Sequence, residues 1–302
     1  MSILLACFIL LVPTGALAHG GAHHLPSPWA LETWVAAALF ASAALYLTGI
    51  VRLWRKAGIG RGVRSWQFCC FLIGWTLLAV ALVSPVHALG ERLFTAHMIE
   101  HEILMAVSAP LLVMARPIAG MLWALPPGGR RIAGTIERNR IIARIWSFLI
   151  DPAVATLIHG IAIWIWHVPI LFNAALANPV VHGLQHISFF ATAILFWWAL
   201  LRGRARVRGY GVAAFYLFLT ALHSGFLGIL ISLTKTPTYP GQTAAAPEWG
   251  LSPLEDQQLA GLIMWIPAGV VYAAASLVMM GIWIHRSSTL SAPGGAHASL
   301  PR

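Results

Sequence analysis

Charged side chains are scarce in this sequence, at 9% of 302 residues, against about a quarter in soluble globular proteins. Hydrophobic residues make up 59%, and they gather in long runs separated by arginine-rich breaks. This composition excludes a soluble enzyme, because such a chain cannot cover its surface with polar groups. The runs are typical of an all-α, polytopic membrane protein.

Cysteine is nearly absent as well. The three cysteines give no disulfide framework and no thiol-based zinc motif. Cys7 falls in a predicted signal peptide, while Cys69 and Cys70 lie near the inner end of a predicted span, where they read as small apolar packing residues. Disulfide-exchange chemistry on the outer side is therefore not expected.

Residues 1–18 have the pattern of a cleaved signal peptide. An apolar core runs from Ile3 to Val12, and a small-x-small cleavage pattern ends at Ala18. An uncleaved membrane anchor is the alternative. Residues 19–28 would form a His-rich periplasmic leader, which either captures a divalent metal or is a plain polar leader.

Seven apolar segments follow within residues 29–285, which we predict to form one transmembrane domain. Most have the roughly 20 residues needed to cross the hydrocarbon core of a membrane. In order, the segments are Trp29–Val51, Trp66–Val86, Leu93–Met114, Pro152–Val168, Val180–Leu201, Gly211–Leu233 and Leu259–Ile284. The polar residues 286–302 are expected to form a disordered cytoplasmic tail.

Basic residues are distributed unevenly among the connections between these spans. Seventeen of the 19 fall on one side, and the other side has only Arg92 and Lys235. The positive-inside rule then places the mature N-terminus outside and the C-terminus in the cytoplasm, in the inner (cytoplasmic) membrane. Topology and contact with anionic membrane lipid account for the net charge of +10, so no nucleic-acid partner is expected.

Two pairs of histidines are the strongest functional signal. His97 and His101 lie four residues apart at the outer end of the third span, and His182 and His186 do so at the outer end of the fifth. A spacing of four puts both imidazoles of a pair on one helix face, where a helix can offer two ligands to one metal. Both spans run inward, so the pairs lie at similar depths and predict one shared site.

Further ligand candidates lie at similar depth. His87 follows the second span, His167 ends the fourth, Asp256 begins the seventh, and Met105 continues the face of the first pair. Imidazole with thioether suits copper, particularly Cu(I), whereas imidazole with carboxylate suits zinc or iron better. The predicted metal ligands are His97, His101, His182, His186, His167, Met105 and Asp256.

Two other chemistries remain open at this stage. Residues 97–101 match H-x-x-E-H, an inverted zinc-protease motif in which Glu100 would act on a metal-bound water. One histidine from each pair could instead hold a haem between the third and fifth spans. Isolated intramembrane histidines such as His159 and His223 are expected to be interhelical hydrogen-bonding residues.

At these residues the chain resembles the multi-pass CtaG family of cytochrome c oxidase assembly factors. Four blocks in order carry the resemblance, over about residues 29–285. They are His97-Met98-Ile99-Glu100-His101 running on to Ala109-Pro110-Leu111-Leu112, Trp166-His167-Val168-Pro169 with Phe172-Asn173-Ala174-Ala175-Leu176, His182-x-x-x-His186 leading to Leu195-Phe196-Trp197-Trp198, and Ser252-Pro253-Leu254-Glu255-Asp256-Gln257-Gln258 leading to Ile263-Met264-Trp265-Ile266-Pro267.

The resemblance implies a non-enzymatic role in respiratory-chain biogenesis. The protein would supply copper to a haem-copper oxidase, with oxidase subunits and periplasmic copper chaperones as partners. The sequence departs from the family at Glu100 and Glu102, where Gln and an apolar residue are expected, and the added carboxylates would make the site harder. A metal-free scaffold for oxidase assembly is the main alternative.

Overall fold

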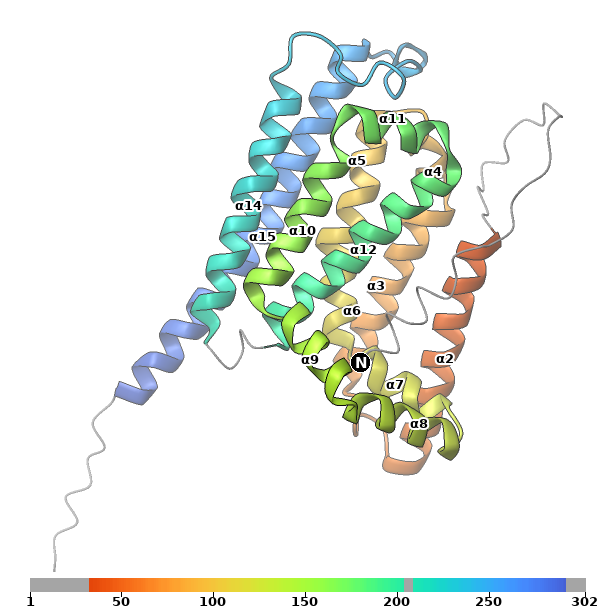
Figure 1. Cartoon of the computed structure of the whole chain (residues 1–302), viewed down its shortest axis with the longest axis vertical. Helices are drawn as coiled ribbons and strands as arrows, with labels where there is room; N and C mark the ends of the chain where they lie inside the picture. The colour runs from red at the N-terminus through yellow and green to blue at the C-terminus, as the bar shows by residue number, and fades with distance from the viewer. Residues whose placement is uncertain (1–32, 204–208, 292–302) are drawn as a thin grey trace, which may run out of the picture.

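The computed structural model describes residues 33–203 and 209–291, and every regular element in those ranges is a helix (Figure 1). The predicted all-α fold is confirmed, with 84% of the described residues helical. The predicted signal peptide (1–18) and His-rich leader (19–28) lie outside the described residues.

Six helical stretches in the described ranges are long and apolar enough to cross a membrane. They are α2 (Thr33–Ala57), α3 (Ser65–Val83), the continuous stretch of α5 (Phe94–Glu102), η1 (Ile103–Ser108) and α6 (Ala109–Ala115), α12 (Pro179–Leu201), α14 (Tyr210–Ser232) and α15 (Pro253–Ser291). This finding supports a polytopic membrane protein, and six of the predicted spans correspond to these stretches.

The predicted fourth span is the exception. Helix α10 (Pro152–Trp166) has 15 residues, and it reaches spanning length only together with α9 (Arg140–Leu149), from which it is bent by 67°. The bend has a local cause: Pro152 begins a new helix, and the Asp151 side chain accepts a hydrogen bond from the backbone N–H of Ala153. The described residues therefore hold six candidate spans, or seven if the bent pair counts as one.

Helix α15 continues past the predicted start of the tail. Residues 286–291 are helical, and the Ser287 hydroxyl donates to the carbonyl of Trp283. The sequence explains why the helix continues. Proline interrupts a helix, and the first proline after Arg286 is Pro293. Helix α15 therefore extends into the predicted tail (286–302), and residues 292–302 lie outside the described ranges.

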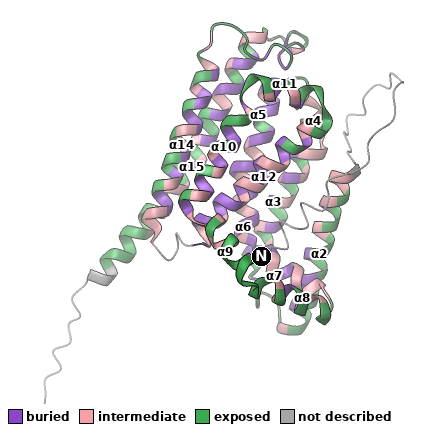
Figure 2. Cartoon of the chain, in the orientation of Figure 1, coloured by how far each residue is buried: buried purple, intermediate pink, exposed green. Residues whose placement is uncertain are grey.

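The stretch formed by α5, η1 and α6 lies at the centre of the bundle, against α3, α12 and α15. Its apolar stretch is 67% buried, compared with 22% for α2, and Figure 2 shows buried residues concentrated along these central helices. Leu104, Phe189 and Phe196 are fully buried and fill the middle of the bundle with apolar side chains.

The two ends of the bundle differ in character (Figure 1). One end carries the short helices α4 (Pro85–Gly90) and α11 (Pro169–Ala177) and a loop with the 3₁₀ helix η2 (Ala246–Trp249). The other carries α7 (Pro117–Ala124), α8 (Pro127–Arg138) and α9, and most of the described arginines. Two of these fasten helix ends: Arg52 donates to the carbonyl of Ala124 and Arg202 to that of Val113.

Candidate functional site

Both predicted histidine pairs lie at the end of the bundle that carries α4. Within each pair the ring centroids are 4.2 Å apart for His97 and His101 on α5, and 4.4 Å apart for His182 and His186 on α12. Between the helices, His101 and His186 are 5.2 Å apart and His97 and His182 are 5.6 Å apart. The structure therefore brings the four imidazoles together between two helices.

Helix starts set the positions of these histidines. The Asn178 side chain accepts from the backbone N–H of Val180 and Val181, which begins α12 at Pro179 and puts His182 in its first turn. The start of α5 is held from another helix, because Asp256 on α15 accepts hydrogen bonds from the backbone N–H groups of Phe94 and Thr95, at 2.8 and 2.9 Å.

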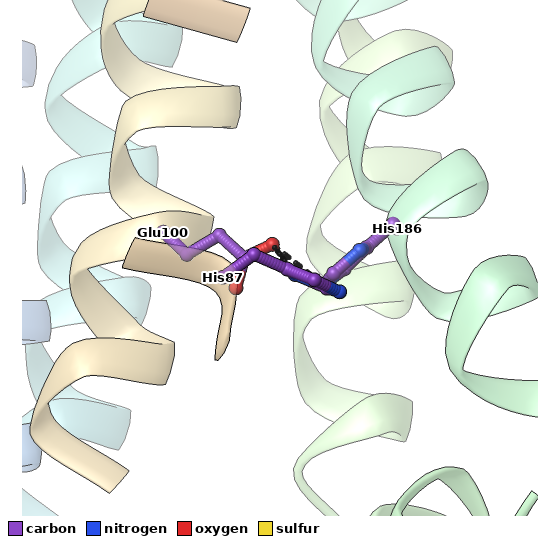
Figure 3. A group of neighbouring side chains, drawn as sticks. All are labelled: His87, Glu100 and His186. Atoms are coloured by element: carbon purple, nitrogen blue, oxygen red, sulfur yellow. Dashed lines mark hydrogen bonds and ion pairs between the residues drawn. The ribbon is translucent and has the colours of Figure 1, made fainter. Parts of the chain in front are cut away.

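The sequence analysis did not place two further residues of the cluster in its ligand set. His87 on α4 donates through Nδ1 to Oε1 of Glu100, at 2.8 Å, and the same oxygen lies 3.5 Å from Nε2 of His186 (Figure 3). The His87 ring is 5.6 Å from His182. The histidine cluster thus consists of His87, His97, His101, His182 and His186 with the Glu100 carboxylate.

A weak signal for both residues was present in the sequence. His87 has the right depth, and Glu100 lies on the same helical turn as His97 and His101. Their contact depends on Gly90, which allows α4 to approach α5 closely: a Cβ atom at Gly90 would lie 2.9 Å from Oε2 of Glu100. A close approach of two helices cannot be read from the spacing of histidines.

The cluster is buried and its polar atoms are short of partners. Glu100 is 0% exposed, and His97 and His101 are each 1% exposed. Among the described residues, neither ring nitrogen of these two histidines has a hydrogen-bond partner, and Oε2 of Glu100 has none. An unsatisfied buried polar group costs about 1–3 kcal/mol, and a bound cation would satisfy the imidazole lone pairs and compensate the carboxylate.

Two groups of side chains have ligand atoms within 4.8 Å of one another. One group is His87, Glu100 and His186, all buried. The other is His87, Glu91 and His182, in which Glu91 is exposed and His182 is partly buried. The candidate donor atoms thus run from the surface into the interior of the bundle.

His167 lies beside the cluster. Its Nδ1 donates to the carbonyl of Ile163 at 2.6 Å, so the lone pair of the neutral ring is on Nε2. Its ring is 6.2 Å from Phe189, and Phe189 is 4.7 Å from the ring of His101. Phe189 therefore links His167 to the cluster.

The other two predicted ligands have different surroundings. Both carboxylate oxygens of Asp256 accept hydrogen bonds from the first turn of α5, and Thr95 also donates its hydroxyl to Asp256 at 2.7 Å. Met105 lies in η1, a π-helical segment with wider turns than an α-helix. The predicted face assumed an α-helical period up to Met105. Of the predicted ligands, His97, His101, His167 and Asp256 are in neither ligand group found among the described residues.

The isolated intramembrane histidines make interhelical hydrogen bonds, as the sequence analysis expected. His159 on α10 is 3.0 Å from the hydroxyl of Thr192 on α12. His223 on α14 accepts from the indole N–H of Trp164 on α10, at 3.3 Å. Both residues lie outside the cluster.

Three aromatic rings cover one side of the cluster. Phe94, Phe172 and Tyr239 have ring centroids 4.6 to 5.2 Å apart, and Phe172 is 5.5 Å from His97. Burial raises the pKa of Tyr239 to about 12, so its hydroxyl stays protonated and donates to the carbonyl of His167 at 2.7 Å. The loop that carries Tyr239 is thereby fastened over the cluster.

The fold and the cluster define a class of protein, a polytopic helical membrane protein with a buried group of histidines and a carboxylate at one end. The chain belongs to the family of cytochrome c oxidase caa3 assembly factors, whose family model matches residues 44–286. The resemblance stated from the sequence motifs is thereby confirmed.

Curated relatives add no function of their own. Uncharacterized proteins from Mycobacterium bovis and Mycobacterium tuberculosis are each 25% identical over 279 residues, covering 89% of this chain and 41% of the relative. One from Mycobacterium leprae is 24% identical over 289 residues, with the same coverage. The chain thus spans about two fifths of the length of these relatives. No solved structure matches the chain.

Proposed function

We propose that this assembly factor binds copper transiently at the histidine cluster and supplies it to a haem-copper oxidase in the inner (cytoplasmic) membrane. The supporting observation is that buried imidazole nitrogens of His97 and His101 have no hydrogen-bond partner among the described residues, while the Glu100 carboxylate lies close by. Membership of the family indicates a role in oxidase assembly, and the histidine cluster offers the donor atoms for metal binding.

The oxidase-assembly family favours copper as cargo, since the imidazole and carboxylate donors alone would also suit zinc or iron. Imidazole binds both copper and zinc, and a set of nitrogen and oxygen donors favours Cu(II) over the softer Cu(I). The proposed ligands are His97, His101, His182 and His186. Transfer requires ligands that exchange, and His182, which is partly exposed at the edge of the otherwise buried cluster, meets that need.

The proposed partners are an oxidase subunit that receives the metal and a periplasmic copper chaperone that donates it. We assign the protein no catalytic reaction of its own. Membrane lipid surrounds the spans, where large apolar side chains such as Phe215 and Val270 are exposed by 58% and 62%.

The test is the metal and haem content per chain of protein purified in mild detergent from copper-replete cells. The parent should carry about one copper, and the double variant His97→Ala, His101→Ala should carry none and should fail to support oxidase maturation. The matched control is His159→Ala, His223→Ala, which removes two intramembrane histidines outside the cluster and should retain copper.

Three results would contradict the copper proposal. Normal oxidase maturation in the His97→Ala, His101→Ala variant would show that the cluster is not required for the function. No metal and no Soret band in the parent would favour a metal-free scaffold. Zinc in place of copper would favour the hydrolase, for which Glu100→Gln alone should abolish activity while the metal stays bound.

A further inference from the structure

The rim of the histidine cluster contains a second group of donor atoms. Glu91, directly after α4, places a carboxylate oxygen within 4.8 Å of ligand atoms of His87 and His182. Glu91 is exposed and His182 is partly buried, whereas His97 and His101 are each 1% exposed. A metal ion that arrives from water meets this group before it meets the deep imidazoles.

The geometry of His87 suits it to bind a metal at the rim. Its Nδ1–H donates to Glu100 at 2.8 Å, so the lone pair of the neutral ring is on Nε2. A histidine that donates its other N–H to a carboxylate is the usual arrangement at metal sites, because the carboxylate fixes the tautomer and raises the basicity of the ring.

The buried histidines need a group of metal ligands between them and the protein surface. An unligated divalent cation entering a buried site loses its hydration before it gains ligands, which is costly. His182 belongs both to the rim group and to the proposed deep ligands, and its ring is 4.4 Å from that of His186. An ion held by His182 can therefore keep one ligand throughout its movement inward.

We propose that His87, Glu91 and His182 form a loading position for divalent metal, from which the ion passes to His97, His101 and His186. This inference rests on the proposed function. In the transfer, the bonds from the metal to Glu91 and His87 break as bonds to the deep imidazoles form, while the bond to His182 is kept. Only metal–ligand bonds form and break in this transfer, and the metal keeps its oxidation state, so no electron is transferred.

The test is the rate at which the full-length protein in mild detergent takes up Cu²⁺ from a weakly chelated stock. The rate is followed by stopped-flow quenching of tryptophan fluorescence, and the affinity by equilibrium titration. Glu91→Gln should load about tenfold more slowly than the parent, because the rim loses a ligand and a charge. Its equilibrium affinity should stay within about twofold of the parent, because the deep imidazoles are unchanged.

Two further variants separate ligation from a general electrostatic effect. Glu248, exposed at the same end and paired with Arg92, loses the same charge in Glu248→Gln and should load at the parent's rate. Glu91→His removes the charge but keeps a metal ligand, so it should load faster than Glu91→Gln, at about the parent's rate.

Two results would overturn the loading position. They are an unchanged loading rate in Glu91→Gln, and equal slowing in Glu91→Gln and Glu248→Gln, which would indicate attraction by the overall field. Failure of the proposed function has a different signature, since the parent itself would then take up no copper, and the inference would fail with it.

Discussion

A single glycine sets the distance between His87 and the rest of the cluster. A Cβ atom at Gly90 would lie 2.9 Å from Oε2 of Glu100 and 3.4 Å from the Cα of His97. Helix α4 has only six residues and packs against both α3 and α5. The position of the His87 ring therefore depends on the missing side chain at residue 90.

Gly90→Ala should displace the Glu100 carboxylate, whose Oε2 would lie 2.9 Å from the new Cβ, and so disturb the hydrogen bond between His87 and Glu100. Loss of such an outer hydrogen bond lowers metal affinity by about 10–100-fold at other metal sites, and we expect a decrease of about tenfold here. Copper titration of the purified protein measures it. The control is Gly128→Ala on α8, where an added Cβ meets no atom within 4 Å; equal affinities in the two variants would contradict the argument.

The site was predictable only where it follows from helical spacing. A spacing of four residues correctly indicated that His97 faces His101 and that His182 faces His186, and matched depth indicated that the pairs meet. Asp256 has the right depth, but its carboxylate holds backbone N–H groups of α5, which a list of polar residues cannot reveal. Met105 lies in a π-helical segment, and nothing in the sequence indicated this change from α-helical turns.

At the scale of elements, helices α14 and α15 approach each other closely at a pair of glycines. A Cβ atom at Gly228 would lie 2.7 Å from the carbonyl oxygen of Gly261, and one at Gly261 would lie 2.6 Å from the carbonyl oxygen of Gly228. Small residues at such crossings let helix backbones approach in a membrane, where packing replaces the hydrophobic effect as the source of association. This contact positions α15, which carries Asp256.

Gly261→Ala should separate these two helices and destabilise the protein by about 1–3 kcal/mol, the usual cost of overpacking. Thermal unfolding in detergent, followed by circular dichroism, measures the loss. Gly269→Ala on the same helix is the control, because its Cβ would meet no atom within 4 Å and alanine favours a helix by up to about 1 kcal/mol. A parent-like midpoint in Gly261→Ala would contradict the packing argument.

Helix positions were more predictable than helix ends. Apolar runs located all six long helical stretches, because a run of about twenty apolar residues has few alternatives to a spanning helix. The fourth span stays a prediction, since α10 alone has 15 residues and reaches spanning length only with α9, which is bent from it by 67°. That bend arises from the capping of Ala153 by Asp151, a local contact with no hydropathy signal.

At the scale of the whole molecule, the orientation of the chain in the membrane is still a prediction. In a cysteine-free background, Thr236→Cys lies in the exposed loop at the cluster end and Arg138→Cys at the opposite end. The positive-inside rule predicts that a membrane-impermeant maleimide labels the first in intact cells and the second only after disruption. The opposite pattern would place the histidine cluster on the cytoplasmic side.

The apolar interior of the bundle limits the path that a metal ion can take through the protein. Beneath the cluster, Leu104, Phe189 and Phe196 are fully buried, and passing a divalent cation among such side chains would cost tens of kcal/mol. Under the copper proposal, a metal ion that enters the cluster therefore leaves by the end at which it entered. The protein would then hold copper at one face of the membrane without passing it across, so that donor and recipient must meet it in the same compartment.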